Sequence, residues 1–194
     1  MTPDPSQERC KWDERYRGSS GPGDPATVLL ENAHLLPGHG QALDVACGLG
    51  ANAMFLAQRG FEVHAWDVSP VAIARLSEES RKGGLPVIVQ VRDVLAEPPT
   101  ANSFDVVVVS RFLDRGLTGS LTNSLRTGGL LFYETFTCER VNDAGPTNLR
   151  YRLAPNELLA LFAALRVIVY REEGRLGDVQ RGFRNQAMLI AQRR

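Results

Sequence analysis

Cysteine is scarce in this sequence and long apolar runs are absent, and each shortage excludes a class of protein. The 194 residues include three cysteines, and none of their spacings is typical of a metal site or a disulfide framework. No apolar stretch approaches the roughly 18 residues of a membrane-spanning helix, and the N-terminus lacks the apolar core of a signal peptide. We therefore expect a cytoplasmic protein with no membrane segment and no metal centre.

An excess of charge of either sign is absent as well. Lys and Arg number 22, as do Asp and Glu, and a net charge of zero argues against non-specific binding to nucleic acid. The charge is divided unevenly, because residues 1–102 carry 9 basic and 13 acidic side chains and residues 103–194 carry the reverse. The arginine-rich second half leaves open either an anionic substrate or an ordinary solvated surface.

The length and the 43% hydrophobic content fit one globular domain in which helices alternate with strands. Residues 106–109 are apolar on both faces, as in a buried parallel strand. Pro25 is expected at the first position of one helix, and Ser69 and Pro70 begin another. We predict helices over residues 10–17, 24–36, 50–59, 71–82, 114–126 and 155–164. We predict strands over residues 41–46, 61–66, 86–91, 104–109, 130–133, 165–170 and 186–191.

The glycine turn after the first strand is the strongest sign of a ligand. Gly48 and Gly50 let the chain turn sharply and let a ligand approach the backbone. Asp44 lies inside the preceding strand, where a carboxylate is unfavourable unless it meets a cation or several N–H donors. An ammonium-bearing ligand would account for Asp44, and a carboxylate that caps its own turn is the alternative.

Acids also follow the next two predicted strands. Asp67 lies 19 residues after Gly48, where a carboxylate accepts hydrogen bonds from ribose hydroxyls. Asp93 ends the third strand, where a carboxylate can accept from an adenine amino group. Because ligands of open α/β sheets bind at the carboxyl ends of the strands, we expect these acids to line one nucleoside site.

Together these residues resemble the class I S-adenosylmethionine-dependent methyltransferases over roughly residues 41–131. The resemblance implies a Rossmann-like α/β fold: a seven-stranded, mostly parallel sheet with an antiparallel last strand and helices on both faces. It places S-adenosylmethionine across the ends of the first four strands. We expect a single domain, with an N-terminal lid and helices in residues 1–36, a cofactor-binding core in 41–135, and a lid loop and closing strands in 137–194.

More narrowly, the chain looks like the small tellurite-resistance type of methyltransferase. This likeness is carried by Trp12-Asp13-Glu14-Arg15-Tyr16, by the turn from Gly48 to Asn52, by Tyr133-Glu-Thr-Phe136 and by residues 182–189. A His-Arg pair that this type often carries before the last strand is missing. The early aromatic pair could be either a lid over the cofactor or an anchor onto the domain. We assign to cofactor binding Trp12, Tyr16, Arg17, Asp44, Ala46, Gly48, Gly50, Asn52, Asp67, Val68, Asp93, Val94 and Ser110.

No general base is evident for the methyl acceptor. The three histidines lie away from the strand ends, and Asp114 and Glu134 have structural explanations as a helix cap and an ion-pair partner. An Asn/Asp-Pro-Pro-aromatic stretch, used by methyltransferases that act on adenine or glutamine amides, is absent. We therefore expect a small acceptor that is already anionic or soft, such as a thiolate or a chalcogen oxyanion, positioned by Arg111 and Arg184.

Other functions remain open on the sequence. The basic second half could serve an RNA or protein acceptor, and the missing histidine leaves room for a non-catalytic cofactor-binding module. A nicotinamide-dependent oxidoreductase is disfavoured by Asp44 and by Ala53 at the third glycine position. We expect a small-molecule substrate, no nucleic-acid partner, and a monomer or homodimer.

Overall fold

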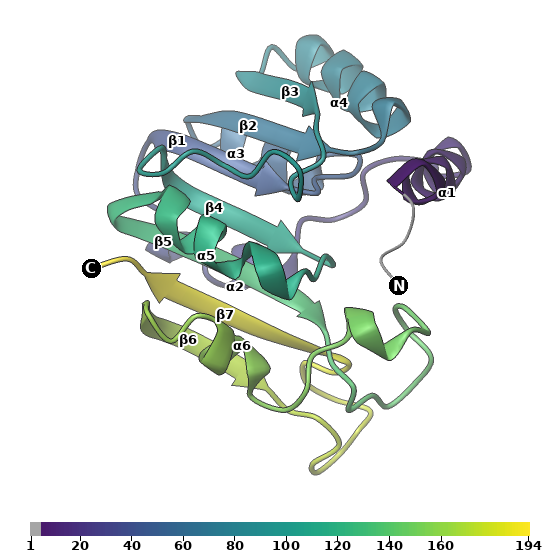
Figure 1. The fold of residues 1–194 in the computed structure, drawn as a ribbon, viewed down its shortest axis with the longest axis vertical. Helices are drawn as coiled ribbons and strands as arrows, with labels where there is room; N and C mark the ends of the chain where they lie inside the picture. Colours follow the sequence, from purple (N-terminus) through teal and green to yellow (C-terminus); the bar gives the residue numbers. More distant parts are fainter. Residues whose placement is uncertain (1–4) are drawn as a thin grey trace.

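A computed structural model describes residues 5–194, and Figure 1 shows one central sheet with helices on both faces. The sheet order is β3-β2-β1-β4-β5-β7-β6, with parallel pairing from β3 to β5 and antiparallel pairing of β7 with both neighbours. This confirms the predicted seven-stranded, Rossmann-like fold. The strands are β1 (Gly40–Val45), β2 (Phe61–Asp67), β3 (Val87–Val91), β4 (Phe104–Ser110), β5 (Leu125–Phe136), β6 (Arg166–Glu172) and β7 (Gln186–Gln192).

Helices cover the sheet because neighbouring strand residues point to opposite faces. On one face α2, α3 and α4 pack on Ala42, Val63 and Val106, and on the other α5 and α6 pack on Leu43 and Val107. Every helix of the described residues is too short or too polar to span a membrane. The helices are α1 (Pro5–Arg17), α2 (Thr27–Glu31), η1 (Ala33–Leu35), α3 (Ala51–Ala57), α4 (Pro70–Lys82), η2 (Arg115–Leu117), α5 (Thr118–Ser124), η3 (Leu149–Tyr151) and α6 (Glu157–Leu161).

Helix α4 begins as its sequence predicts. The Ser69 hydroxyl accepts a hydrogen bond from the Ala72 N–H at 3.2 Å, and Pro70 occupies the first helical position. The helix ends where Gly83 and Gly84 follow Lys82. Local signals are sufficient here because the cap and the proline both act within one turn of the chain.

The helix predicted over residues 24–36 is wrong in its extent. Helix α2 starts only at Thr27, and Ala26 is extended with ψ 143°. The Ala26 N–H donates to the Asn52 side chain at 2.9 Å, so a contact with a distant residue holds this segment out of a helix. Pro25 therefore does not occupy a first helical position.

The helix predicted over residues 114–126 also ends too late. Helix α5 stops at Ser124. Arg126 belongs to β5, and its guanidinium forms an ion pair with the Asp105 carboxylate at 2.7 Å. Pairing of this end of β5 with β4 is irregular, and Gly128 has a φ of 84°. Elsewhere α6 is shorter than the prediction, and α1 and β5 are longer.

Candidate cofactor and acceptor site

The chain takes unusual conformations at the carboxyl ends of the neighbouring strands β1 and β4. Ala46 and Arg111 both have left-handed φ values, 53° and 55°, although neither is glycine. Non-glycine residues in this region are strained, and such strain is concentrated at functional sites. The two residues therefore mark the sheet edge between β1 and β4, where the strand order reverses.

Gly48 and Gly50 form the turn between β1 and α3, with φ values of 54° and 84°. A Cβ on Gly50 would lie 2.2 Å from a methyl carbon of Leu76, which is fully buried in α4. Glycine is thus required at this position by both the backbone angle and the close packing of α3 against α4.

Asp44, in β1, stabilises the start of α3 directly after this turn. Its carboxylate is completely buried and accepts hydrogen bonds from the Ala53 N–H at 3.1 Å and from Asn52 Nδ2 at 3.4 Å. Burial raises the pKa of Asp44 to about 7, against the lowering effect of these two hydrogen bonds. The sequence left two explanations for Asp44, an ammonium-bearing ligand or a carboxylate that caps its own turn. The structure contains the capping contact, which Asp44 makes with N–H groups at the N-terminus of α3.

Asp67 holds the turn from the side of β2. One carboxylate oxygen accepts from the Gly48 N–H at 2.8 Å, and the other accepts from the Ser69 N–H at 2.9 Å. Burial raises the pKa of Asp67, and the nearby Asp13 carboxylate adds to the effect. Val68 follows half-buried, so the end of β2 and the glycine turn form one connected unit.

Asp93 is less closely tied to this unit. Its carboxylate accepts a hydrogen bond from the Leu95 N–H at 2.9 Å, within the turn that follows β3. Val94 is buried against the core on the α5 side of the sheet. The structure thus connects the first two acids of the predicted series directly and leaves the third at the neighbouring strand end.

Asn52 joins three parts of the site. Besides Asp44, its Nδ2 donates to the Ser110 hydroxyl at 2.9 Å, and its Oδ1 accepts from the Ala26 N–H. The Asn52 side chain is buried, and these hydrogen bonds satisfy its amide group there. Both predicted residues Asn52 and Ser110 therefore connect the ends of β1 and β4 to the N-terminal segment.

Helix α1 covers the glycine turn. The Asp13 carboxylate accepts a short hydrogen bond from the Ser69 hydroxyl, and the Tyr16 hydroxyl would lie 2.9 Å from a Cβ on Gly48. Burial, together with Asp67, raises the pKa of Tyr16. Arg75 Nη1 donates to the carbonyl oxygens of Tyr16, at 2.6 Å, and of Ser19, at 3.0 Å.

The sequence predicts the aromatic pair of α1 but not the contacts that attach the helix to the domain. Trp12 and Tyr16 stack with ring centroids 5.7 Å apart, as their spacing indicates, and Arg17 is exposed at the end of α1. Asp13 and Ser69 are 56 positions apart in the chain, and no local pattern predicts that they meet.

Two arginines in the loops at this end of the sheet, Arg152 and Arg184, form hydrogen bonds within their own loops. Arg152 is 1% exposed and donates to the carbonyl oxygens of Pro146 at 2.7 Å and Thr137 at 2.8 Å, and also to that of Ala144. These contacts organise the loop of residues 137–153. A guanidinium held in this way stabilises the loop that it belongs to.

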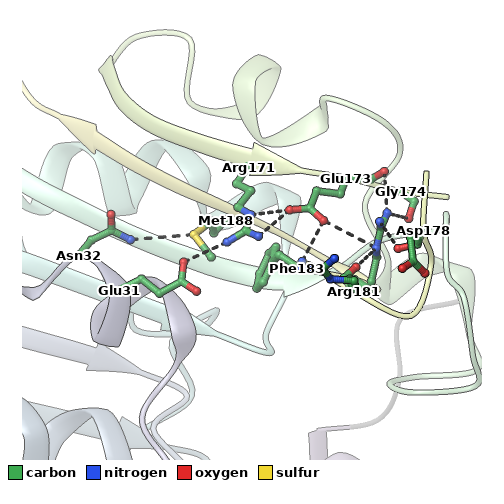
Figure 2. A network of polar contacts seen from close by, with 10 residues as sticks. Glu31, Asn32, Arg171, Glu173, Gly174, Asp178, Arg181, Phe183 and Met188 are labelled. Atoms are coloured by element: carbon green, nitrogen blue, oxygen red, sulfur yellow. Dashed lines mark hydrogen bonds and ion pairs between the residues drawn. The ribbon is translucent and has the colours of Figure 1, made fainter. Parts of the chain in front are cut away.

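Arg184 is engaged similarly in the loop between β6 and β7. Its guanidinium donates to the carbonyl oxygens of Arg181 at 2.6 Å, Asp178 at 2.9 Å and Gly174 at 3.1 Å, and it lies 3.7 Å from the Glu173 carboxylate. Figure 2 labels the loop residues Glu173, Gly174, Asp178 and Arg181 that take part in this network. These contacts give Arg184 a loop-stabilising role.

Arg111 differs from these residues because its side chain is exposed at the end of β4. Its backbone N–H donates to the Glu134 carbonyl oxygen at 2.8 Å. The Glu134 carboxylate is buried and accepts from the Val28 N–H at 2.7 Å, and burial raises its pKa while Arg111 lowers it. Glu134 thus fastens α2 to the sheet through its carboxylate.

Two surface hollows lie beside the elements of the site. One, of about 280 Å³, is lined by Leu49 of the glycine turn together with Pro25 and Phe55, and the other, of about 490 Å³, adjoins His64, Trp66 and Phe104. The first hollow therefore reaches the glycine turn from the side of α3.

Solved structures described as S-adenosylmethionine-dependent methyltransferases share this fold, among them one from Methanosarcina mazei with a TM-score of 0.67 at 19% identity. Residues 42–129 match a family model described as a methyltransferase domain, and they span β1 to the start of β5. Methyltransferases of this fold use S-adenosylmethionine, the cofactor that the sequence predicts.

Particular relatives agree with this class. The chain is 27% identical to a probable S-adenosyl-L-methionine-dependent methyltransferase TehB of Haemophilus influenzae, over 75% of this chain and 52% of the relative. It is 33% identical to a ubiquinone biosynthesis O-methyltransferase of Xanthomonas axonopodis pv. citri, over 62% of this chain and 56% of the relative. The chain thus spans about half the length of these curated relatives.

A solved structure has the same fold over nearly the whole chain. The crystal structure of TehB from Haemophilus influenzae superposes with a TM-score of 0.71 over 96% of this chain and 67% of that one, at 20% identity. The fold therefore extends beyond the matched residues 42–129 to α1 and the closing strands.

Proposed function

We propose that the protein is an S-adenosylmethionine-dependent methyltransferase with a small acceptor. The observation that supports this best is the pair of buried acids beside the glycine turn. Within residues 5–194, Asp44 and Asp67 accept hydrogen bonds from N–H groups but form no ion pair with Lys or Arg, and their pKa values are raised. S-adenosylmethionine carries a positive sulfonium and a positive ammonium group, whereas nucleotide phosphates would add negative charge here.

Each residue of the turn has a defined part in this proposal. Gly48 and Gly50 face the methionine part, and Asp67 accepts from the ribose hydroxyls with lone pairs that the backbone N–H groups leave available. Asp93 and Val94 flank the adenine. When bound, the cofactor supplies an electrophilic sulfonium methyl. The supporting and covering residues are Trp12, Tyr16, Arg17, Asp44, Ala46, Asn52, Val68 and Ser110.

The acceptor that fits this site is small and is already anionic or soft, such as a thiolate or a chalcogen oxyanion. One relative is named an O-methyltransferase, and a neutral hydroxyl acceptor needs a base. Glu134, the carboxylate at the end of β5, is occupied by the Val28 N–H. Arg111 is exposed beside it and can orient an anion, while α1 and the loop of residues 137–153 flank the same sheet edge (Figure 1).

Calorimetric titration of the full chain tests the cofactor. We expect saturable binding of S-adenosylmethionine and of S-adenosylhomocysteine, and no binding of NAD at the same concentration. Binding of NAD without binding of either adenosyl compound would overturn the proposal.

Transfer of a radiolabelled methyl group tests the acceptor. Selenite, tellurite and a small thiol are offered singly, with ribosomal RNA and a cell-extract protein fraction in parallel. Label in the small compounds supports the proposal, and label only in RNA or protein contradicts the acceptor class while leaving the cofactor intact. Cofactor binding with no transfer to any acceptor would favour a non-catalytic module.

A further inference from the structure

The two edge strands of the sheet, β3 and β6, differ in how their outer edges are protected. An unpaired edge invites pairing with another strand, and proteins usually block it with charge, proline or a bulge. β6 has a register shift between Val167 and Val169 and carries Arg166, Arg171 and Glu172. β3, with the sequence Val-Ile-Val-Gln-Val, has no charge, no proline and an unbroken register with β2.

The outer side of β3 offers unpaired backbone groups. The Pro86 carbonyl oxygen accepts from the Val63 N–H, and the Arg92 N–H donates to the Asp67 carbonyl oxygen. In a parallel ladder the pairing residues alternate, so those that point toward β2 are the even-numbered ones. The N–H and C=O groups of Val89 and Val91 consequently face away from the sheet.

Apolar side chains accompany this edge. Ile88, Val91 and Leu95 are 54%, 48% and 51% exposed. The crossover from β3 to β4, residues 92–103, contains no helix, so the face of β3 that carries Ile88 and Gln90 is left uncovered. Figure 1 shows β3 as the outermost strand at the top of the sheet, with α4 on one side only.

We propose that β3 pairs in antiparallel fashion with β3 of a second copy of this chain, joining the two sheets into one. A two-fold axis at Val89 places Val89 opposite its own copy, Val87 opposite Val91, and Ile88 opposite Gln90. No charge meets a like charge along the strand. The outward N–H and C=O groups of each copy face those of the other, apart from the Val87 N–H, which donates to the Leu85 carbonyl oxygen at 2.9 Å. Such a contact is self-complementary, as a two-fold dimer requires.

Charges at both ends of β3 are largely balanced within the chain. Lys82, before the strand, pairs with Glu78 at 2.8 Å and Glu79 at 3.1 Å, and Arg92, after the strand, lies 3.9 Å from Glu97. Antiparallel pairing of two copies therefore brings no large excess of like charge together at either end, and the contact depends on the backbone groups and apolar side chains of β3.

Molecular mass in solution tests this interface independently of any enzymatic activity. Sedimentation or light scattering of the full chain, from micromolar to roughly hundredfold higher concentration, is expected to show a shift from 21.3 kDa toward twice that mass. Val91→Lys puts a charge on the outer edge and should weaken the dimer at least about tenfold. Val167→Lys, at the similarly exposed edge residue of β6, is the matched control and should not.

A second variant guards against misfolding. Val91→Pro removes an N–H that points away from β2, so it should break the dimer and keep the monomer folded, as judged by circular dichroism. A wild type that stays at 21.3 kDa throughout overturns the proposal. So does a dimer that persists in both folded Val91 variants, or one that only Val167→Lys dissociates.

Discussion

The glycine turn and the loops after β5 and β6 hold charged side chains in different ways. Asp44 and Asp67 accept hydrogen bonds from neutral N–H groups, no Lys or Arg of residues 5–194 pairs with them, and burial raises their pKa values. Arg152 and Arg184 also lie in loops at the carboxyl edge of the sheet, but several carbonyl oxygens of those loops surround their guanidinium groups. A buried charge that meets only one or two neutral donors is thus stronger evidence for a charged ligand than a guanidinium that its own loop surrounds.

Removing Arg152 should produce the largest effect, and it should be on stability. Arg152→Met leaves several buried carbonyl oxygens without a donor, which we expect to lower the free energy of unfolding by about 3 kcal/mol. Urea unfolding measures this change. Affinity for S-adenosylmethionine should change less than about twofold in the folded fraction, and a large loss of affinity would remove the contrast between the two regions.

Removing Asp67 should mainly lower the affinity for S-adenosylmethionine, in contrast to the loss of stability expected for Arg152. Asp67→Ala deletes the acceptor of the Gly48 and Ser69 N–H groups and the proposed ribose contact. We expect affinity for S-adenosylmethionine to fall roughly 100-fold, or about 2.7 kcal/mol, by calorimetry. Asp93→Ala, at the neighbouring strand end, is the comparison and should cost less. Equal losses for the two variants would contradict the central place given to Asp67.

Arg111 extends the comparison, because its exposed side chain directly follows β4, at the switch in strand order. Arg111→Gln should lower kcat/KM for an anionic acceptor about tenfold and leave cofactor affinity unchanged. Arg184→Gln serves as the control, with an expected effect on stability. If Arg184→Gln lowers kcat/KM more than Arg111→Gln does, the loop-stabilising role of Arg184 is wrong.

The remaining prediction concerns the pH dependence of stability through Asp44. Folding raises its pKa from 3.8 to about 7, so the folded protein binds this proton more tightly than the unfolded chain. The contribution of the Asp44 proton to the free energy of unfolding is complete below about pH 4 and is lost as the pH rises to about 7. The unfolding free energy of the wild type relative to Asp44→Asn should fall over that range by at most about 1.4 kcal/mol per pH unit. Parallel pH curves would contradict the raised pKa.

The positions of the strands along the chain, the glycine turn and the acids at strand ends could be predicted because each depends on a short stretch of chain, whereas the arrangement of the sheet followed from the resemblance to a family. Asp67 follows from a strand boundary and a fixed distance to Gly48. The extent of α2 could not be predicted, since Asn52 and Glu134 hold residues 26–28 from far along the chain.

The same limit applies to the arginines. Sequence places Arg184 near the last strand, but which carbonyl oxygens surround it depends on the path of a long loop. Arg152 was one of several arginines near a loop, and nothing local indicates that it is the buried one. Side-chain destinations in long loops are set by tertiary packing, whereas a glycine turn is set by its own backbone.

The position of α1 over the glycine turn has a kinetic consequence. Tyr16 lies against Gly48 of the turn, Asp13 bonds Ser69 beside it, and Arg75 fastens the end of the helix, so we expect a ligand that binds under α1 to require these contacts to open. The observed association rate should then level off at high ligand concentration, at the rate of helix opening, instead of rising in proportion. Stopped-flow fluorescence of Trp12 would follow this step, and a rate that stays linear in concentration would contradict it. The helix would in this way set how quickly the site can exchange one ligand for the next.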